Sequence, residues 1–100
     1  MSEKITYENK DNDIICYFKV KMDSNSCSEI ERGLLESIRK TEGAVVFNLQ
    51  AVDYVASAFL RLCVLVSREK GKDKFSVTNA SPNVMKVIKI AGLDEILSPN

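Results

Sequence analysis

Four stretches of the chain have the apolar pattern of β-strands. In residues 14–22 the even positions are apolar while Lys19 and Lys21 are among the odd ones, a period of two that predicts a strand with one buried face. A shorter strand is expected over 5–8, and turn chemistry at 9–12 would join the two into a hairpin. Residues 44–49 are apolar without alternation, which predicts a central strand covered by helices on both faces. Residues 75–79 alternate again and predict the last strand.

Three other stretches repeat their apolar residues at helical spacing. The first helix follows the polar segment 23–26, and Ser28 with Glu31 has the form of a capping box at its start. A second helix is predicted over 58–68 with Ser57 as its N-cap. The third has Ser81 as cap before Pro82, stops at Gly92 and is followed by a short turn over 93–97. The inner stripe predicted for the third helix is Val84, Val87, Ile88 and Ala91.

The order of these elements predicts an α/β fold. Strand, strand, helix, strand, helix, strand, helix requires right-handed crossovers and a mostly parallel sheet of about four to five strands, with helices packed on it and the hairpin at its edge. The chain has 100 residues, of which 45% are apolar, and this is enough for one core without metals or disulfides. We therefore expect a single domain spanning 1–100.

Composition excludes several classes of function. Fourteen basic residues balance fourteen acidic ones, so no global field draws the chain to nucleic acid. There is no histidine, which removes the base of a Ser-His-Asp triad and the commonest zinc ligand, and we expect neither a metal nor a cofactor. Three cysteines in apolar patterns suit buried thiols in a cytoplasmic protein. No stretch approaches the roughly 18 apolar residues of a membrane span, and none at the N-terminus suits a signal peptide.

Ser57 is the candidate functional residue. In open α/β sheets, sites gather in the loops that leave the carboxyl ends of the strands, and Ser57 closes the loop that leaves the central strand. At about 100° per residue, Arg61, Val64 and Arg68 fall on the same side of the helix as Ser57, and a mixed cationic and apolar stripe suits protein docking. A phosphate on Ser57 would meet the N–H groups of the first helical turn and lie within reach of Arg61. Capping is the competing interpretation, because Ser is favoured at helix starts.

The loop 54–60, Tyr-Val-Ala-Ser-Ala-Phe-Leu, resembles the phosphorylation loop of STAS domains, the family of bacterial anti-sigma factor antagonists. The segment 83–97 is similar to that family's ending, and Met22-Asp23 matches its Leu-Asp after the second strand. The order of elements agrees over nearly the whole chain. The resemblance implies a STAS-like fold and a cytoplasmic regulatory protein that is not an enzyme.

The resemblance also implies how such a protein would act. In the family, the unmodified domain binds a serine kinase that doubles as an anti-sigma factor; the kinase phosphorylates the loop serine and releases the domain, and a serine phosphatase resets it. Ser57 matches the phosphorylated position, and Asp23 matches a neighbouring loop of the partner-facing patch. We expect a monomer or weak dimer that does not bind nucleic acid directly. The partner-binding residues expected are Asp23, Ala56, Ser57, Ala58, Arg61, Val64 and Arg68.

Two departures from the family pattern leave an alternative open. Ala56 stands where the family has Asp, and Ala58-Phe59 where it has Ser/Thr-Gly. We expect Phe59 to fill the core, whereas the missing carboxylate favours a constitutive, non-phosphorylated STAS adaptor that docks on a kinase, a sensor complex or a transporter ATPase. A small enzyme is a third interpretation, for which the sequence offers only Asp53 as a loop base.

Overall fold

The predicted order of strands and helices is present in the computed structural model, which describes residues 4–19 and 21–93. Two pieces beyond that order also appear, a two-residue strand in the loop before Ser57 and a single 3₁₀ turn. The elements are β1 (Ile5–Lys10), β2 (Asp13–Phe18), β3 (Lys21–Met22), α1 (Ser24–Lys40), β4 (Val45–Asn48), β5 (Tyr54–Val55), α2 (Ser57–Lys70), η1 (Lys72–Lys74), β6 (Phe75–Thr78) and α3 (Pro82–Ile90). The turn predicted over 93–97 lies almost entirely outside the described residues.

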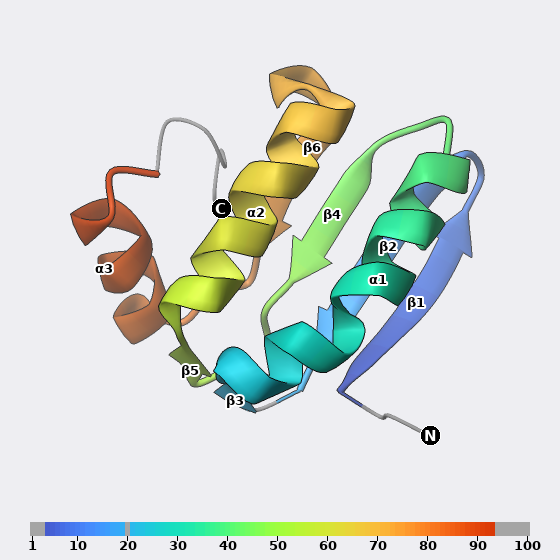
Figure 1. Ribbon diagram of the computed structural model, residues 1–100. Coiled ribbons are helices and arrows are strands. Elements are labelled where there is room, and N and C mark those ends of the chain that lie inside the picture. Colours follow the sequence, from blue (N-terminus) through green and yellow to red (C-terminus); the bar gives the residue numbers. More distant parts are fainter. Residues whose placement is uncertain (1–3, 20, 94–100) are drawn as a thin grey trace.

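The main sheet has four strands in the order β1-β2-β4-β6. β1 and β2 form the antiparallel hairpin at one edge, and β2, β4 and β6 run parallel, with Cys16, Phe47 and Val77 side by side in the register. The prediction of a mostly parallel sheet with an edge hairpin is confirmed. Because β2, β4 and β6 point the same way, the loops that follow them emerge at one edge of the sheet (Figure 1).

The strand predicted over 14–22 is not continuous. β2 ends at Phe18, opposite Ile5, and β3 then pairs with β5 in a separate two-stranded parallel sheet. The apolar alternation survives the break because Phe18 and Met22 are both buried. A period of two reports which side chains are buried but not which strand lies alongside.

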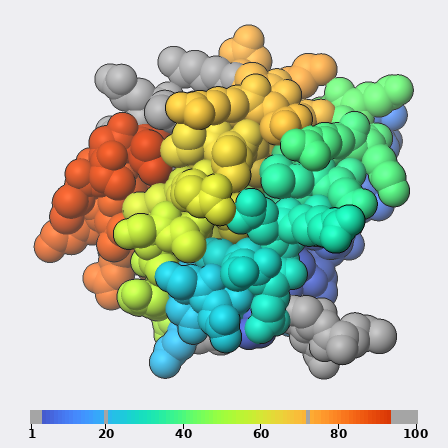
Figure 2. Space-filling view, in the orientation of Figure 1, coloured from blue at the N-terminus to red at the C-terminus, as the bar shows by residue number. Residues whose placement is uncertain are grey.

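Both α1 and α2 lie on the same face of the main sheet (Figure 1), and in the space-filling view they cover it side by side (Figure 2). α3 lies to one side, next to β5. The prediction that helices cover both faces of β4 is therefore wrong for the described part of the chain. Val45 and Phe47 are fully buried beneath the helices, whereas Val46 and Asn48 on the opposite face are only half-buried.

The caps of α1 and α3 differ in how well the sequence predicts them. α1 begins at Ser24, because the Asp23 carboxylate accepts a hydrogen bond from the Ser26 backbone N–H at 2.8 Å. The capping box predicted at Ser28 is therefore wrong, since that residue lies inside the helix. For α3 the prediction is confirmed: the Ser81 hydroxyl accepts from the Val84 N–H at 3.2 Å.

Four phenylalanines form the centre of the core. The ring of Phe47 meets those of Phe18 and Phe75 edge-on at centroid distances of 4.7 and 4.8 Å, and Phe59 meets Phe18 at 5.0 Å. Such edge-to-face pairs add attraction beyond the burial of apolar area. Phe59 is fully buried, which confirms its predicted place in the core.

The three cysteines are buried and free, as predicted. Burial raises the pKa of Cys16 to about 12 and that of Cys27 to about 11, and it raises the pKa of Cys63 as well. Thiols that stay protonated at neutral pH are poor nucleophiles and poor metal ligands. These residues therefore belong to the packing of the core.

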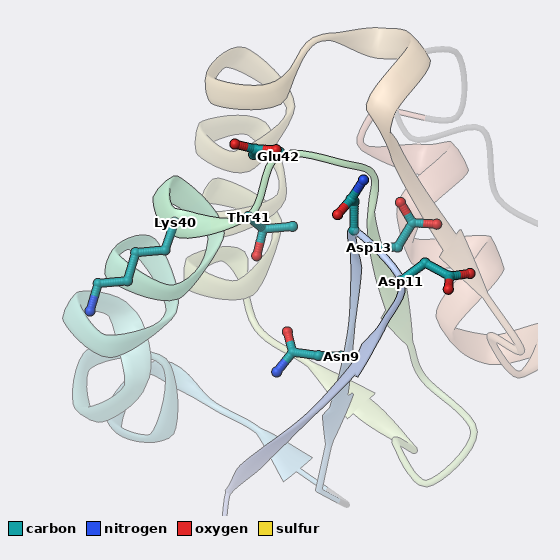
Figure 3. A pocket seen from close by; sticks show the side chains of 7 residues that line it. Asn9, Asp11, Asp13, Lys40, Thr41 and Glu42 are labelled. Atoms are coloured by element: carbon teal, nitrogen blue, oxygen red, sulfur yellow. The ribbon is translucent and has the colours of Figure 1, made fainter.

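A polar turn closes the end of the sheet opposite the Ser57 loop. The Asp13 carboxylate accepts from the Ala44 N–H at 2.7 Å, and the Gly43 N–H donates to the Asn12 carbonyl at 2.8 Å. A Cβ at residue 43 would collide with the Asp13 carboxylate and the Asn12 carbonyl, so the turn requires glycine there. A hollow of about 270 Å³ opens beside this turn (Figure 3), and within the described residues no three acidic or cysteine side chains are grouped to hold a metal.

Candidate functional site

The small sheet brings two loops of the predicted site together. β3 and β5 run parallel, with Lys21 opposite Tyr54 and Met22 opposite Val55. Asp23 and Ala56 are the next residues of the two chain segments, and the Ala56 N–H donates to the Met22 carbonyl at 3.0 Å. The structure therefore places these two residues at one edge, with Ser57 immediately after.

Ser57 is exposed and is the first residue of α2, not its cap. Ala56 takes the N-cap position, with its carbonyl accepting from the N–H groups of Phe59 at 2.9 Å and Leu60 at 3.3 Å. The predicted capping role of Ser57 is therefore wrong. The helix starts one residue earlier than the cap preference indicates, and the buried side chain of Phe59 lies in its first turn.

The stripe predicted along α2 is present on its outer side. Ser57, Arg61 and Arg68 are exposed, while Val64 and Ala58 are half-buried. Arg61, however, donates to the Glu31 carboxylate of α1 at 2.7 Å. A phosphate on Ser57 would have to compete with Glu31 for this guanidinium, a partner that the sequence did not indicate.

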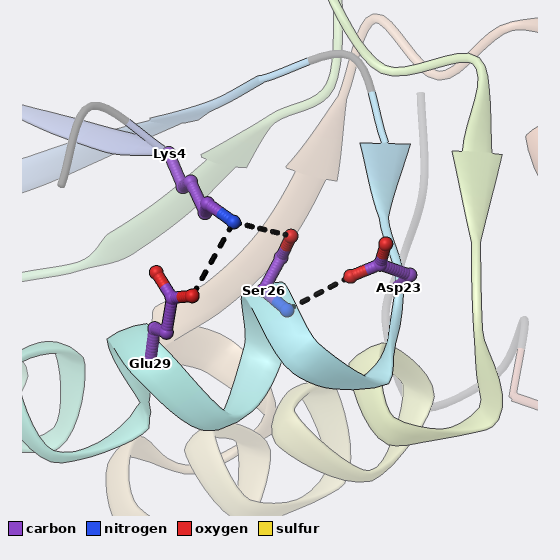
Figure 4. A network of polar contacts seen from close by, with 4 residues as sticks. All are labelled: Lys4, Asp23, Ser26 and Glu29. Carbon is purple, nitrogen blue, oxygen red and sulfur yellow. Dashed lines mark hydrogen bonds and ion pairs between the residues drawn. The ribbon is translucent and has the colours of Figure 1, made fainter.

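Asp23 has a structural role at the start of α1 (Figure 4). The hydrogen bond from the Ser26 backbone N–H lowers the pKa of Asp23 below its usual value. The Ser26 hydroxyl in turn accepts from Lys4 Nζ at 3.3 Å, and Lys4 lies 3.5 Å from the Glu29 carboxylate. This network ties the start of β1 to the first turns of α1 and holds an ionised carboxylate at the edge that also carries Ser57.

A hollow beside the Ser57 loop was not predicted. It measures about 170 Å³ and lies between β5 and α3, where its lining includes Tyr54, Asn83 and Val87. Val87 and Ala91 were predicted on the inner stripe of this helix, but both are exposed, and Val84 and Ile88 are the buried residues. The sequence did hold a signal for this exposed surface. The helix has more apolar residues than one stripe can hold, and a helix packed on one side cannot bury them all.

Comparison with known proteins gives one curated relative and several solved structures. The chain is 28% identical over 91 residues to BtrV of Bordetella bronchiseptica (strain ATCC BAA-588 / NCTC 13252 / RB50), named as a candidate anti-sigma factor antagonist; the match covers 89% of this chain and 78% of BtrV. An anti-sigma-factor antagonist (STAS) domain protein from Planctomyces limnophilus superposes with a TM-score of 0.85 at 17% identity, covering 96% of this chain and 87% of that one.

The anti-sigma factor antagonist SpoIIAA has the same fold. Its unphosphorylated form superposes with a TM-score of 0.79 at 17% identity, over 96% of this chain and 87% of SpoIIAA. The phosphorylated form of SpoIIAA, from Bacillus, gives 0.71 at 16% identity, over 96% and 90%. At such identities the solved structures establish a shared fold.

Two further observations bear on the class of protein. Among the described residues, none of the helices combines the length and the apolar character that crossing a membrane requires. The family model of the STAS domain matches residues 4–100, which is all but the first three positions. The chain therefore belongs to the STAS domain family.

Proposed function

We propose that this protein is a partner-switching regulator of the anti-sigma factor antagonist type. Its unmodified form binds a serine kinase that acts as an anti-sigma factor, through the edge that carries Asp23, Ala56 and Ser57, and phosphorylation of Ser57 ends that binding. The observation that carries the proposal is the exposed Ser57 on the first turn of α2, beside Asp23 and not engaged as a cap. The protein would work in the cytoplasm as one domain over 1–100, with a serine phosphatase restoring the unmodified form.

The chemistry of the switch is a phosphoryl transfer. The Ser57 Oγ would attack the γ-phosphorus of ATP, the bond to the ADP oxygen would break, and the hydroxyl proton would pass to a base of the kinase. Ala56 provides no carboxylate next to the acceptor, so the base cannot come from residue 56. The product would carry about −1.5 to −2 charges at pH 7, at a helix N-terminus whose N–H groups favour anions. The fold could therefore hold the added charge without unfolding.

A constitutive STAS adaptor is the second candidate, and Ala56 is the observation that favours it. In that case the same edge would bind a kinase, a sensor complex or a transporter ATPase at all times, and Ser57 would never be modified. The two candidates differ in whether the serine accepts phosphate and in the range of partners. They share the fold, the edge and the docking stripe of α2.

The first prediction is that serine kinases of the anti-sigma factor type from the source cell phosphorylate the chain at Ser57. The protein is incubated with each purified kinase and ATP, and the modified residue is mapped by mass spectrometry. We expect Ser57→Ala to abolish the modification and Ser28→Ala, an exposed serine of α1, to leave it unchanged.

Binding measurements separate the candidates further. Ser57→Ala should bind the kinase as the wild type does, and Ser57→Asp should bind at least about tenfold more weakly. Binding without any phosphorylation of Ser57 would favour the constitutive adaptor. Equal binding by both variants would show that the Ser57 loop is not the interface.

A further inference from the structure

Apolar side chains remain exposed on β5 and α3. Tyr54 is 51% exposed, Val87 38% and Ile90 77%, and the hollow of about 170 Å³ lies beside Tyr54 and Val87. Val87 and Ile90 are one helical turn apart and so share a stripe of α3. We call this region, with Asn83 at its border, the α3 surface. Its hollow is several times the volume of a water molecule, which gives an aliphatic side chain room to enter.

Lysines border the α3 surface on two sides. Lys86 is exposed on α3, next to Val87 in the chain and one turn before Ile90, and this helix has no acidic residue from Pro82 to Ile90. On the other side, Lys21 is directly opposite Tyr54 in the register of β3 and β5, and both residues are exposed. Asp53 adds one carboxylate to the lining of the hollow. Lys21 and Lys86 outnumber this carboxylate, and two cations beside an apolar centre favour an acidic partner.

The same charges disfavour the other occupants of such a surface. In a symmetric contact between two copies, the same patch meets itself, so the lysines of one copy would face those of the other. A lipid surface would need a wide apolar helix face. α3 buries Val84 and Ile88 against the core and leaves only a narrow stripe outside.

We propose that the α3 surface is a second docking site for the serine kinase that meets Ser57. A segment of the kinase places an apolar side chain in the hollow, and carboxylates flanking that side chain pair with Lys21 and Lys86. The inference rests on the proposed function, because Tyr54 lies three residues before Ser57 and one partner can cover both sites. The two sites have different tasks: phosphorylation acts at the Ser57 edge, and the α3 surface adds to the affinity of the unmodified form.

The test measures binding of the kinase that phosphorylates Ser57 to the purified full chain, by calorimetry at two salt concentrations. Ile90→Glu should weaken binding about tenfold, because it places a negative charge at a desolvated contact. Ile90→Lys at the same position should weaken it less, since its charge matches the acidic partner. Lys86→Glu should weaken binding about fivefold and reduce its dependence on salt.

Two controls keep the outcomes distinct. Lys40→Glu changes the same charge at the opposite end of the sheet and should bind as the wild type does, and circular dichroism establishes that each variant is folded. Wild-type binding by Ile90→Glu and Lys86→Glu, with Ser57→Asp still impaired, overturns the second site and leaves the proposed function standing. Equal loss for Ile90→Glu and Ile90→Lys overturns the acidic partner. A chain that binds no serine kinase overturns both proposals.

Discussion

A single carboxylate, that of Asp23, both starts α1 and stands beside the candidate phosphorylation site. Its Oδ1 accepts from the Ser26 N–H at 2.8 Å, and this bond favours the ionised form. A depressed pKa means that the folded state binds the proton less readily than the unfolded chain does. The stabilisation by Asp23 is therefore complete above the unfolded value of 3.8 and is lost as the pH falls through the lower folded value.

The matching prediction compares two substitutions. Asp23→Ala should lower the melting temperature by a few degrees at pH 7, because an N–H of the first turn loses its acceptor. Asp23→Asn keeps an acceptor oxygen without the charge and should recover only part of the loss. Thermal melting followed by circular dichroism at pH 7 and pH 2.5 measures both, and Asp53→Ala at the same edge serves as control. A loss from Asp23→Ala that is as large at pH 2.5 as at pH 7 would contradict the role of the ionised group.

The roles of some single residues could be predicted from the sequence, and the roles of others could not. The buried Phe59 and the cap at Ser81 were predictable, since aromatic residues at helical spacing and a Ser-Pro pair have few alternatives. The role of Ser57 was not, because cap preference says which residues suit a helix start and not where the core fixes its first turn. Arg61 was assigned to a phosphate four residues away because contacts with a residue of another helix leave no local signal.

At the scale of elements, α1 and α2 are joined at both ends. Near the Ser57 edge, Arg61 meets Glu31, and at the far end Lys70 Nζ donates to the carbonyls of Thr41 and Ile38 at the C-terminus of α1. A cation at the last carbonyls of a helix is favourable. The Arg61 pair is exposed and contributes little to folding, so its guanidinium can change partners at small cost.

That exchange can be tested without any kinase. Ser57→Asp places a carboxylate one turn before Arg61, where it competes with Glu31 for the guanidinium. In a double-mutant cycle by urea unfolding, Glu31→Gln and Ser57→Asp should therefore couple by about 0.5 kcal/mol, with the double variant more stable than the sum predicts. Glu36 is exposed and lies on α1 like Glu31, and Glu36→Gln should show no coupling to Ser57→Asp. Additive effects of Glu31→Gln and Ser57→Asp on the free energy of unfolding would show that Arg61 does not reach a carboxylate at residue 57.

The elements that the sequence predicted best were the long ones. Periodicity over ten or more residues located α1 and α2, whereas β3 and β5 have two residues each and carry no measurable period. Their pairing is non-local, so only the folded chain reveals it. The sheet that organises the candidate site was thus absent from the prediction, although Asp23 and Ser57 were both named.

For the molecule as a whole, the four phenylalanines link the parallel strands of the main sheet to α2. Phe18, Phe47 and Phe75 come from the three parallel strands, and Phe59 joins them from α2. Removing a fully buried ring leaves a cavity that close packing cannot fill. The cluster therefore sets much of the global stability.

Phe59→Ala should lower the free energy of unfolding by about 3 to 5 kcal/mol, and Phe59→Leu by less. Tyr54→Ala, which removes a half-exposed ring from the same region, should cost far less. Denaturant unfolding measures all three variants. A loss for Phe59→Ala no larger than that for Tyr54→Ala would show that the cluster can collapse around the vacancy.

The position of Phe59 also determines how the phosphorylated protein would differ from the unmodified one. It is the third residue of α2 and is locked among rings, only two positions after Ser57. A group added to Ser57 would then alter the electrical potential of the edge while its outline stayed nearly constant. A partner would discriminate by sensing that potential, and its preference between the two forms should fade as the ionic strength rises.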